Sequence, residues 1–195
     1  MFTSHLLLGL AWAGYCVLHS LLADLKVKQF FRARSGNSFR YYRSFYNLVA
    51  FLLLVALLIW IVIMPSQKIW NAVLPQYFIG GLLAVAGFTG ISVVLKKYFV
   101  TSEGFRDLFY EGGTPTLVID GLHRYVRHPL YLSTFLFLWG LLLLIPVWSM
   151  LVTNVVITGY TLIAIRLEEK KLVDTFGDRY IDYRKVVPMI WPRIR

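Results

Sequence analysis

The residues best suited to chemistry lie in two short polar clusters, each at the end of a long apolar run. The first is the stretch 124–131, Arg-Tyr-Val-Arg-His-Pro-Leu-Tyr, which stands where a charged, glycine-containing loop meets an apolar run. The second comprises Arg166, Glu168 and Glu169, at the far end of the next apolar run. Ionisable residues at a membrane boundary are costly and are rarely kept without a use. The two clusters together predict a small polar ligand held at a membrane surface.

The residue types in these clusters indicate what such a ligand would carry. Pro129 suits the first turn of a helix, whose free N–H groups attract a carboxylate or phosphate, and Arg127 and His128 lie directly before it. Glu168 and Glu169 offer acceptors for hydroxyl or ammonium groups. Flat faces for a planar base or a sulfonium come from Tyr125, Tyr131, Phe176, Tyr180 and Tyr183. S-adenosylmethionine matches every part, and a lipid headgroup matches several of them.

The composition predicts an all-α integral membrane protein. Hydrophobic residues make up 58% of the 195 residues and charged residues only 15%, whereas a soluble domain carries about 25% charged residues. Five apolar runs approach the ~20 residues that cross a bilayer. We expect a single domain over residues 1–195, with five transmembrane helices at about 3–23, 44–64, 76–95, 129–145 and 147–165.

The charge pattern predicts the orientation of the chain. Of the 20 lysines and arginines, all except Lys68 fall in segments that alternate to one side of the expected membrane. The positive-inside rule places that side in the cytoplasm, so the N-terminus is outside and the C-terminus is cytoplasmic. The net charge of +10 therefore follows from the positive-inside rule and does not indicate nucleic-acid binding. We also expect the basic surface to contact anionic lipid headgroups.

Other kinds of catalytic centre find no support in the sequence. We see no serine nucleophile elbow, no zinc-protease motif and no phosphate-cradling loop. Cys16 is the only cysteine and reads as a small apolar residue. The sequence predicts no metal site, because the four histidines do not have the spacing of metal ligands. These histidines are His5, His19, His123 and His128.

The elements around the clusters predict how they meet. The fourth and fifth expected spans form a hairpin that turns at Ile145-Pro146, with arms of nearly equal length, about 25 Å each. The start of one arm and the end of the other therefore lie side by side. We expect a cytoplasmic C-terminal helix beyond the hairpin, bent or ended at Gly177. Small residues in the third span predict close packing of another helix, with a narrow cofactor slot as the alternative: Gly80, Gly81, Ala84, Gly87 and Gly90.

The first cluster and the positions that follow it resemble a known family. The stretch 125–131 is followed by Leu167, Glu168, Glu169, Phe176, Gly177, Tyr180, Tyr183, Val187 and Pro188. This combination resembles the signature of the isoprenylcysteine carboxyl methyltransferase-like membrane methyltransferases. Residues 19–23, 43–46 and 107–109 resemble the bacterial methanethiol S-methyltransferase and NnrU-type branch. That family usually has glycine two residues after the motif tyrosine, where this chain has Ser133.

The resemblance implies a methyltransferase of the bacterial inner membrane that binds S-adenosylmethionine at the cytoplasmic face, within residues 116–188. The implied cofactor-binding residues are Val118, Tyr125, Arg127, His128, Pro129, Tyr131, Glu168, Glu169, Tyr180 and Tyr183. Arg166 is the expected contact for an anionic methyl acceptor, and an interfacial arginine is the alternative. The implied acceptor is a small or lipophilic thiol, or a prenylcysteine-type carboxylate, that enters laterally from the lipid.

Two other functions stay open. One is a non-catalytic NnrU-like accessory membrane protein, and the other is a relative of the NADPH-dependent sterol reductases, which are larger. Binding of S-adenosylmethionine or of NADPH separates these from the methyltransferase. The sequence points to no obligate protein partner.

Overall fold

The computed structural model describes residues 2–35, 39, 41–100 and 116–192, and these residues form a helical protein. The only β-type pairing among them is an isolated antiparallel bridge between Lys68 and Val147. The helices are α1 (Phe2–Ala23), α2 (Leu25–Ser35), α3 (Tyr42–Ile63), α4 (Leu74–Val100), the short 3₁₀ helix η2 (Gly121–Arg124), α6 (Pro129–Leu144), α7 (Trp148–Phe176) and α8 (Asp178–Val186). The predicted all-α class is confirmed.

Four helices are long and apolar enough to cross a membrane: α1, α3, α4 and α7. They identify an integral membrane protein. The fourth expected span corresponds to α6, which has only 16 residues and is about 24 Å long at 1.5 Å per residue. Helix α7 has 29 residues and continues well past the predicted end of the fifth span. The segment 107–109 lies outside the described residues.

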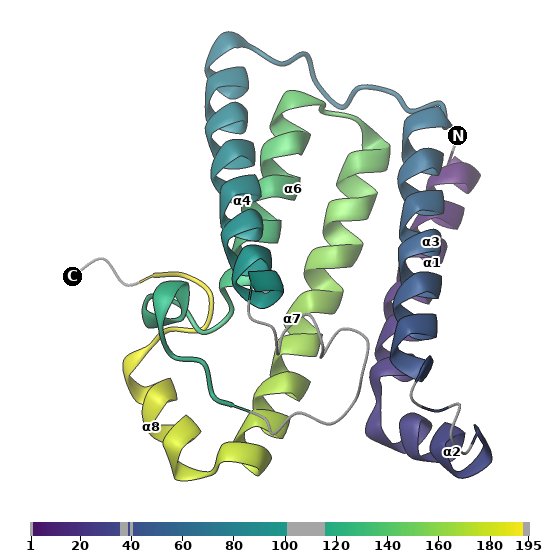
Figure 1. Cartoon of the computed structure of the whole chain (residues 1–195). Coiled ribbons are helices and arrows are strands. Elements are labelled where there is room, and N and C mark those ends of the chain that lie inside the picture. Colours follow the sequence, from purple (N-terminus) through teal and green to yellow (C-terminus); the bar gives the residue numbers. More distant parts are fainter. Residues whose placement is uncertain (1, 36–38, 40, 101–115, 193–195) are drawn as a thin grey trace.

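The long helices stand side by side in the order α4, α6, α7, α1 and α3 (Figure 1). Helices α6 and α7 are therefore central: α4 packs on α6 from one side, and α1 packs on α7 from the other. Residues 145–147 join them. The Trp139 indole donates to Thr158 Oγ1 at 3.1 Å, and the buried Asn154 amide donates to the Leu138 carbonyl at 2.9 Å. These bonds fix the register in which the start of α6 meets the far half of α7.

Helix α4 packs most extensively on α6, and glycines allow the two backbones to touch. A Cβ added at Gly87 would lie 2.3 Å from the Phe137 nitrogen and 2.6 Å from the Ser133 carbonyl oxygen. One added at Gly140 would lie 2.5 Å from the Ala84 nitrogen. The predicted close packing is confirmed for Gly80, Ala84, Gly87 and Gly90, whose contact with α6 leaves no slot for a cofactor, whereas Gly81 faces away from α6.

Ser133 belongs to this same helix contact. It is buried, its hydroxyl donates to the Pro129 carbonyl at 2.8 Å, and it faces Gly90 across the interface. A Cβ at Gly90 would lie 2.2 Å from Ser133 Oγ and 3.0 Å from Ser133 Cβ. Ser133 is therefore accommodated by the absence of a side chain on α4.

We expect Gly90→Ala to destabilise the protein by about 1–3 kcal/mol, because the added methyl overlaps the Ser133 side chain. The double variant with Ser133→Gly should recover most of this loss, since glycine removes the overlapping atoms. Thermal unfolding in detergent measures both, with Ser133→Gly alone as the control for the loss of helix propensity. Losses that simply add in the double variant would contradict the contact.

The opposite side of the bundle is an apolar cluster of α1 and α3 packed on α7. Its buried members are Leu8, Trp12, Leu57 and Met64. Ser20 is hydrogen-bonded to Tyr160 of α7. His19 is hydrogen-bonded to the Tyr46 hydroxyl, 3.0 Å from Nε2. His19 therefore has a packing role between α1 and α3.

The chain returns to the start of α6 after α7. Helix α7 ends at Phe176 because Gly177 takes a φ of +55°, which residues with a Cβ rarely adopt. Helix α8 then runs back along the site. The Arg127 N–H donates to the Pro188 carbonyl at 2.9 Å and the His128 N–H to the Met189 carbonyl at 3.1 Å. Ile190 is buried with Phe135 and Ile165, so this return is anchored by apolar packing.

Candidate functional site

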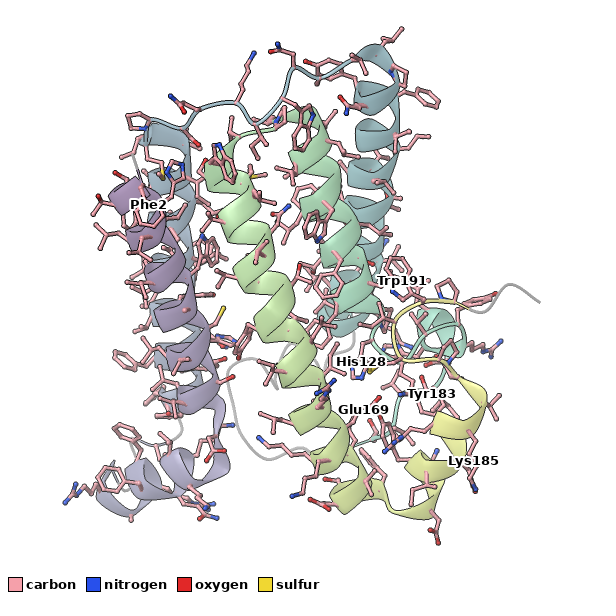
Figure 2. All side chains as sticks on the ribbon, turned by 180° about the vertical axis from the view of Figure 1, so that it is seen from behind. Phe2, His128, Glu169, Tyr183, Lys185 and Trp191 are labelled. Carbon is pink, nitrogen blue, oxygen red and sulfur yellow. The ribbon has the colours of Figure 1, made fainter. Side chains whose placement is uncertain are left out.

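The two polar clusters meet at one end of the α6–α7 pair. His128 Nε2 lies 3.3 Å from Glu169 Oε1, and His128 Nδ1 lies 3.7 Å from Glu168 Oε2. The Tyr131 hydroxyl donates to Glu168 Oε2 at 3.0 Å, and its ring stacks on His128 with centroids 5.6 Å apart. Figure 2 shows His128 and Glu169 close together with Tyr183 beside them, whereas Lys185 points away.

Arg127 joins this cluster from the other side of Glu169. Its Nε and Nη2 atoms lie 2.7 Å and 2.6 Å from Glu169 Oε1. Its Nη1 atom donates to the Val187 carbonyl at 2.5 Å and to the Arg184 carbonyl at 3.3 Å. The side chains of Arg127 and Glu169 are only 10% and 11% exposed. The ion pair is therefore buried and tied to the end of α8.

Helix α8 supplies two tyrosines to the site. Tyr183 donates from its hydroxyl to the His123 carbonyl at 2.6 Å, which fastens α8 to η2. Tyr180 is 1% exposed, and its ring lies 5.9 Å from that of Tyr183. Burial raises the pKa of Tyr180 to about 12, with a further contribution from the Glu169 charge. Burial also raises the pKa of Tyr183 to about 12.

These pKa values predict a loss of stability at alkaline pH. The folded protein holds both phenolic protons up to about pH 12, whereas an unfolded chain releases them near 10. Stability should therefore be full below about pH 10 and fall as the pH rises from there to about 12. Unfolding temperature against pH, in the wild type and in Tyr183→Phe, measures the effect. A spectrophotometric titration in which every phenol ionises near 10 would contradict it.

The remaining predicted site residues differ in their surroundings. Pro129 is buried in the first turn of α6, and Val118 is half-buried in the extended segment before η2. Tyr125 is 67% exposed, so it faces away from the buried part of the polar network. Arg166 is exposed on α7, and within the described part of the chain it makes no ion pair or hydrogen bond. The structure therefore gathers Arg127, His128, Tyr131, Glu168, Glu169, Tyr180 and Tyr183, and leaves Tyr125 and Arg166 outside the network.

Sequence reasoning missed the contribution of the end of α8 and of the segment that follows it. Arg184 approaches the second oxygen of Glu169, with Nε 3.8 Å from Oε2, and its carbonyl binds Arg127. Met189 and Tyr131 pack against the same buried apolar cluster. The one available signal was the Val187-Pro188 pair, where proline ends a helix and favours an extended chain.

An apolar cavity of about 630 Å³ lies at the opposite end of the bundle. Phe2, which lines it, lies far from His128 in Figure 2. The other lining residues are His5, Leu6, Gly9, Leu10, Gln67, Trp148 and Val152. No ionisable cluster converges there among the described residues. Its lining is mostly apolar, so the cavity is set apart in character from the polar network at the other end.

The fold and site together define a helical membrane protein with a network of polar side chains at one end of its bundle. The chain belongs to the family described as phospholipid methyltransferase, whose model matches residues 75–179, more than half of the chain. This match and the named relatives described next together confirm the resemblance to the isoprenylcysteine carboxyl methyltransferase-like enzymes and their bacterial methanethiol branch. The matched region includes α6, α7 and the network residues Arg127, His128, Tyr131, Glu168 and Glu169, and it ends before Tyr180 and Tyr183.

Relatives of known name fall in two groups. A methanethiol S-methyltransferase of Crocosphaera subtropica is 46% identical over 74 residues, which are 37% of this chain and 28% of the relative. One of Pseudomonas deceptionensis is 27% identical over 93% of this chain and 70% of the relative. The protein-S-isoprenylcysteine O-methyltransferase of Schizosaccharomyces pombe is 40% identical over 40% of this chain and 34% of the relative. The chain thus spans only part of these proteins. No solved structure matches it.

Proposed function

We propose that this protein is an integral membrane methyltransferase that uses S-adenosylmethionine and methylates a small or lipophilic thiol, or a prenylcysteine-type carboxylate. The observation that carries the proposal is the network of His128, Tyr131 and Glu168 beside the Arg127–Glu169 pair. Family membership and the names of the relatives support it. We further propose five spans, with α6 as the fourth, and a cytoplasmic site.

The exposed parts of the site suit this cofactor. The Glu168 side chain is 44% exposed and can accept hydrogen bonds from an ammonium or from ribose hydroxyls. The Tyr131 ring is half-buried and stacks on the buried His128 ring. Its outer face offers a flat surface, which suits adenine or a sulfonium. When bound, S-adenosylmethionine supplies a methyl group that its sulfonium has already activated. The protein then contributes orientation and exclusion of water, and no covalent enzyme intermediate is required.

Binding and transfer assays test the proposal. Isothermal titration in detergent should show that the wild type binds S-adenosylmethionine and its demethylated product. Labelled cofactor should then transfer its methyl group to at least one of methanethiol, longer thiols, prenylcysteine analogues or phospholipids. Absence of cofactor binding would leave the accessory-protein function, and tight NADPH binding would favour the reductase.

Arg166 is proposed to attract the anionic acceptor. It is exposed and has no partner in the described structure, so its charge is available to a thiolate or carboxylate. Arg166→Gln should lower kcat/KM for the acceptor about tenfold, in line with loss of about 1.4 kcal/mol, and leave cofactor affinity unchanged. Lys170→Gln, an exposed cation one turn along α7, is the control. Equal effects of both variants would indicate a general surface-charge effect.

A further inference from the structure

We propose that Glu169 and Arg127 form an internal clasp that positions the site, and that Glu168 is the carboxylate that faces the cofactor. The proposal rests on the proposed function and divides the work within the glutamate pair. Its basis is the difference between two adjacent side chains, of which one is 11% exposed and the other 44% exposed.

Glu169 has little capacity left for a ligand. Its Oε1 atom receives Arg127 Nε at 2.7 Å, Arg127 Nη2 at 2.6 Å and His128 Nε2 at 3.3 Å. Its Oε2 atom faces Arg184 Nε at 3.8 Å. A carboxylate has about four acceptor positions. Oε1 carries three close contacts, and the 11% exposure of the side chain leaves little of Oε2 open to a ligand. The contacts of Glu169 thus join α7 to the residues before α6 and to α8.

Arg127 is engaged in the same way. Four of the N–H groups of its guanidinium point at Glu169 and at the carbonyls of Val187 and Arg184, out of five in total. An arginine in this state does not offer a free fork to a carboxylate or phosphate. It instead holds the end of α8 against the start of α6.

The clasp is continued by the backbone. The Arg127 and His128 N–H groups donate to the carbonyls of Pro188 and Met189. Side-chain and backbone bonds thus tie residues 184–189 to the turn that sets the position of His128. Breaking a buried ion pair by neutralising one partner leaves the other charge uncompensated. We therefore expect the side-chain and backbone bonds between residues 184–189 and residues 127–128 to weaken together.

Glu168 has the opposite character. Among the described residues its close polar contacts are the Tyr131 hydroxyl at 3.0 Å and His128 Nδ1 at 3.7 Å. Both neighbours come from the start of α6, and both approach the same oxygen, Oε2. The remaining acceptor positions are open to a ligand ammonium or hydroxyl group.

Hydrogen exchange on the whole protein in detergent tests whether Glu168 and Glu169 have these different roles. In cofactor-free Glu169→Gln, the amides of Arg127 and His128 should exchange about tenfold faster than in the wild type, as expected for loss of a local closing interaction. Saturating S-adenosylmethionine should restore their protection. Cofactor-free Glu168→Gln should exchange like the wild type, while its cofactor Kd rises about tenfold, as for one lost charge-assisted hydrogen bond.

Further arms separate the clasp from general destabilisation. Amides in α4 around Gly87 should be unchanged in Glu169→Gln; faster exchange there as well would overturn the clasp. Arg127→Lys keeps the charge but loses the planar fork, and should loosen the same two amides. Weakened cofactor binding in both glutamate variants without any change in exchange would mean that both carboxylates touch the ligand, and would also overturn the proposal. If the wild type binds no S-adenosylmethionine, the proposed function and the Glu168 assignment fail, while exchange in the cofactor-free variants still decides the clasp.

Discussion

His128→Ala is expected to abolish detectable S-adenosylmethionine binding and, with it, methyl transfer. The imidazole is only 5% exposed and lies between the two carboxylates, 3.3 Å from Glu169 and 3.7 Å from Glu168. Removing it leaves a void, takes away the ring on which Tyr131 stacks and withdraws a hydrogen-bonding partner from Glu169. Losses of about 2–4 kcal/mol follow from such changes, which correspond to about 30- to 1000-fold in Kd.

His123→Ala is the matched control for that variant. His123 lies in η2, five residues before His128, and it contacts the site through its backbone carbonyl, which accepts the Tyr183 hydroxyl. Alanine keeps that carbonyl, so cofactor affinity should stay close to the wild type. Isothermal titration of both variants, with thermal unfolding to show that each is folded, measures the difference. Equal weakening in the two variants would remove His128 from the cofactor site.

The meeting of the polar clusters could be predicted from the sequence because it depends on simple helix geometry. Two apolar runs of equal length, joined by a short turn at Pro146, bring residue 128 level with the end of the second run near residue 165, about one helical turn before residues 168–169. The close approach of another helix to α4 could also be predicted from the sequence, because glycines at helical spacing have few other uses within a membrane. The position of Ser133 was harder. Its contact with Gly90 depends on the register between α4 and α6, which local sequence does not fix.

The roles of Glu168 and Glu169 could not be separated from the sequence. Adjacent residues on a helix point about 100° apart, so one of the pair must face α6 more directly, but the sequence does not say which. The partner of Arg127 was also out of reach. It depends on residues 184–189 folding back over the start of α6, a long-range contact that periodicity does not encode. Tertiary packing therefore determines that Arg127 and Glu169 form a buried ion pair and that Glu168 stays partly exposed.

Gly87→Ala is expected to be among the most damaging single substitutions outside the polar site. The added Cβ would lie 2.3 Å from the Phe137 nitrogen and 2.6 Å from the Ser133 carbonyl oxygen. Both atoms belong to the α6 backbone, so no side-chain rotation relieves the overlap, and the two helices must separate. We expect a loss of about 3 kcal/mol in stability, at the upper end for overpacking. Thermal unfolding in detergent measures it.

Gly81→Ala is the internal control, because an added Cβ there meets nothing within 4 Å. Both glycines lie within α4, and alanine raises helix propensity by about 1 kcal/mol at either position, so their difference isolates the contact with α6. Displacement of α6 should also move Pro129 and His128 at its start. Gly87→Ala should therefore weaken S-adenosylmethionine binding even in protein that remains folded, while Gly81→Ala should not. Equal stability and affinity in the two variants would show that α4 does not hold α6, and with it the polar site, in place.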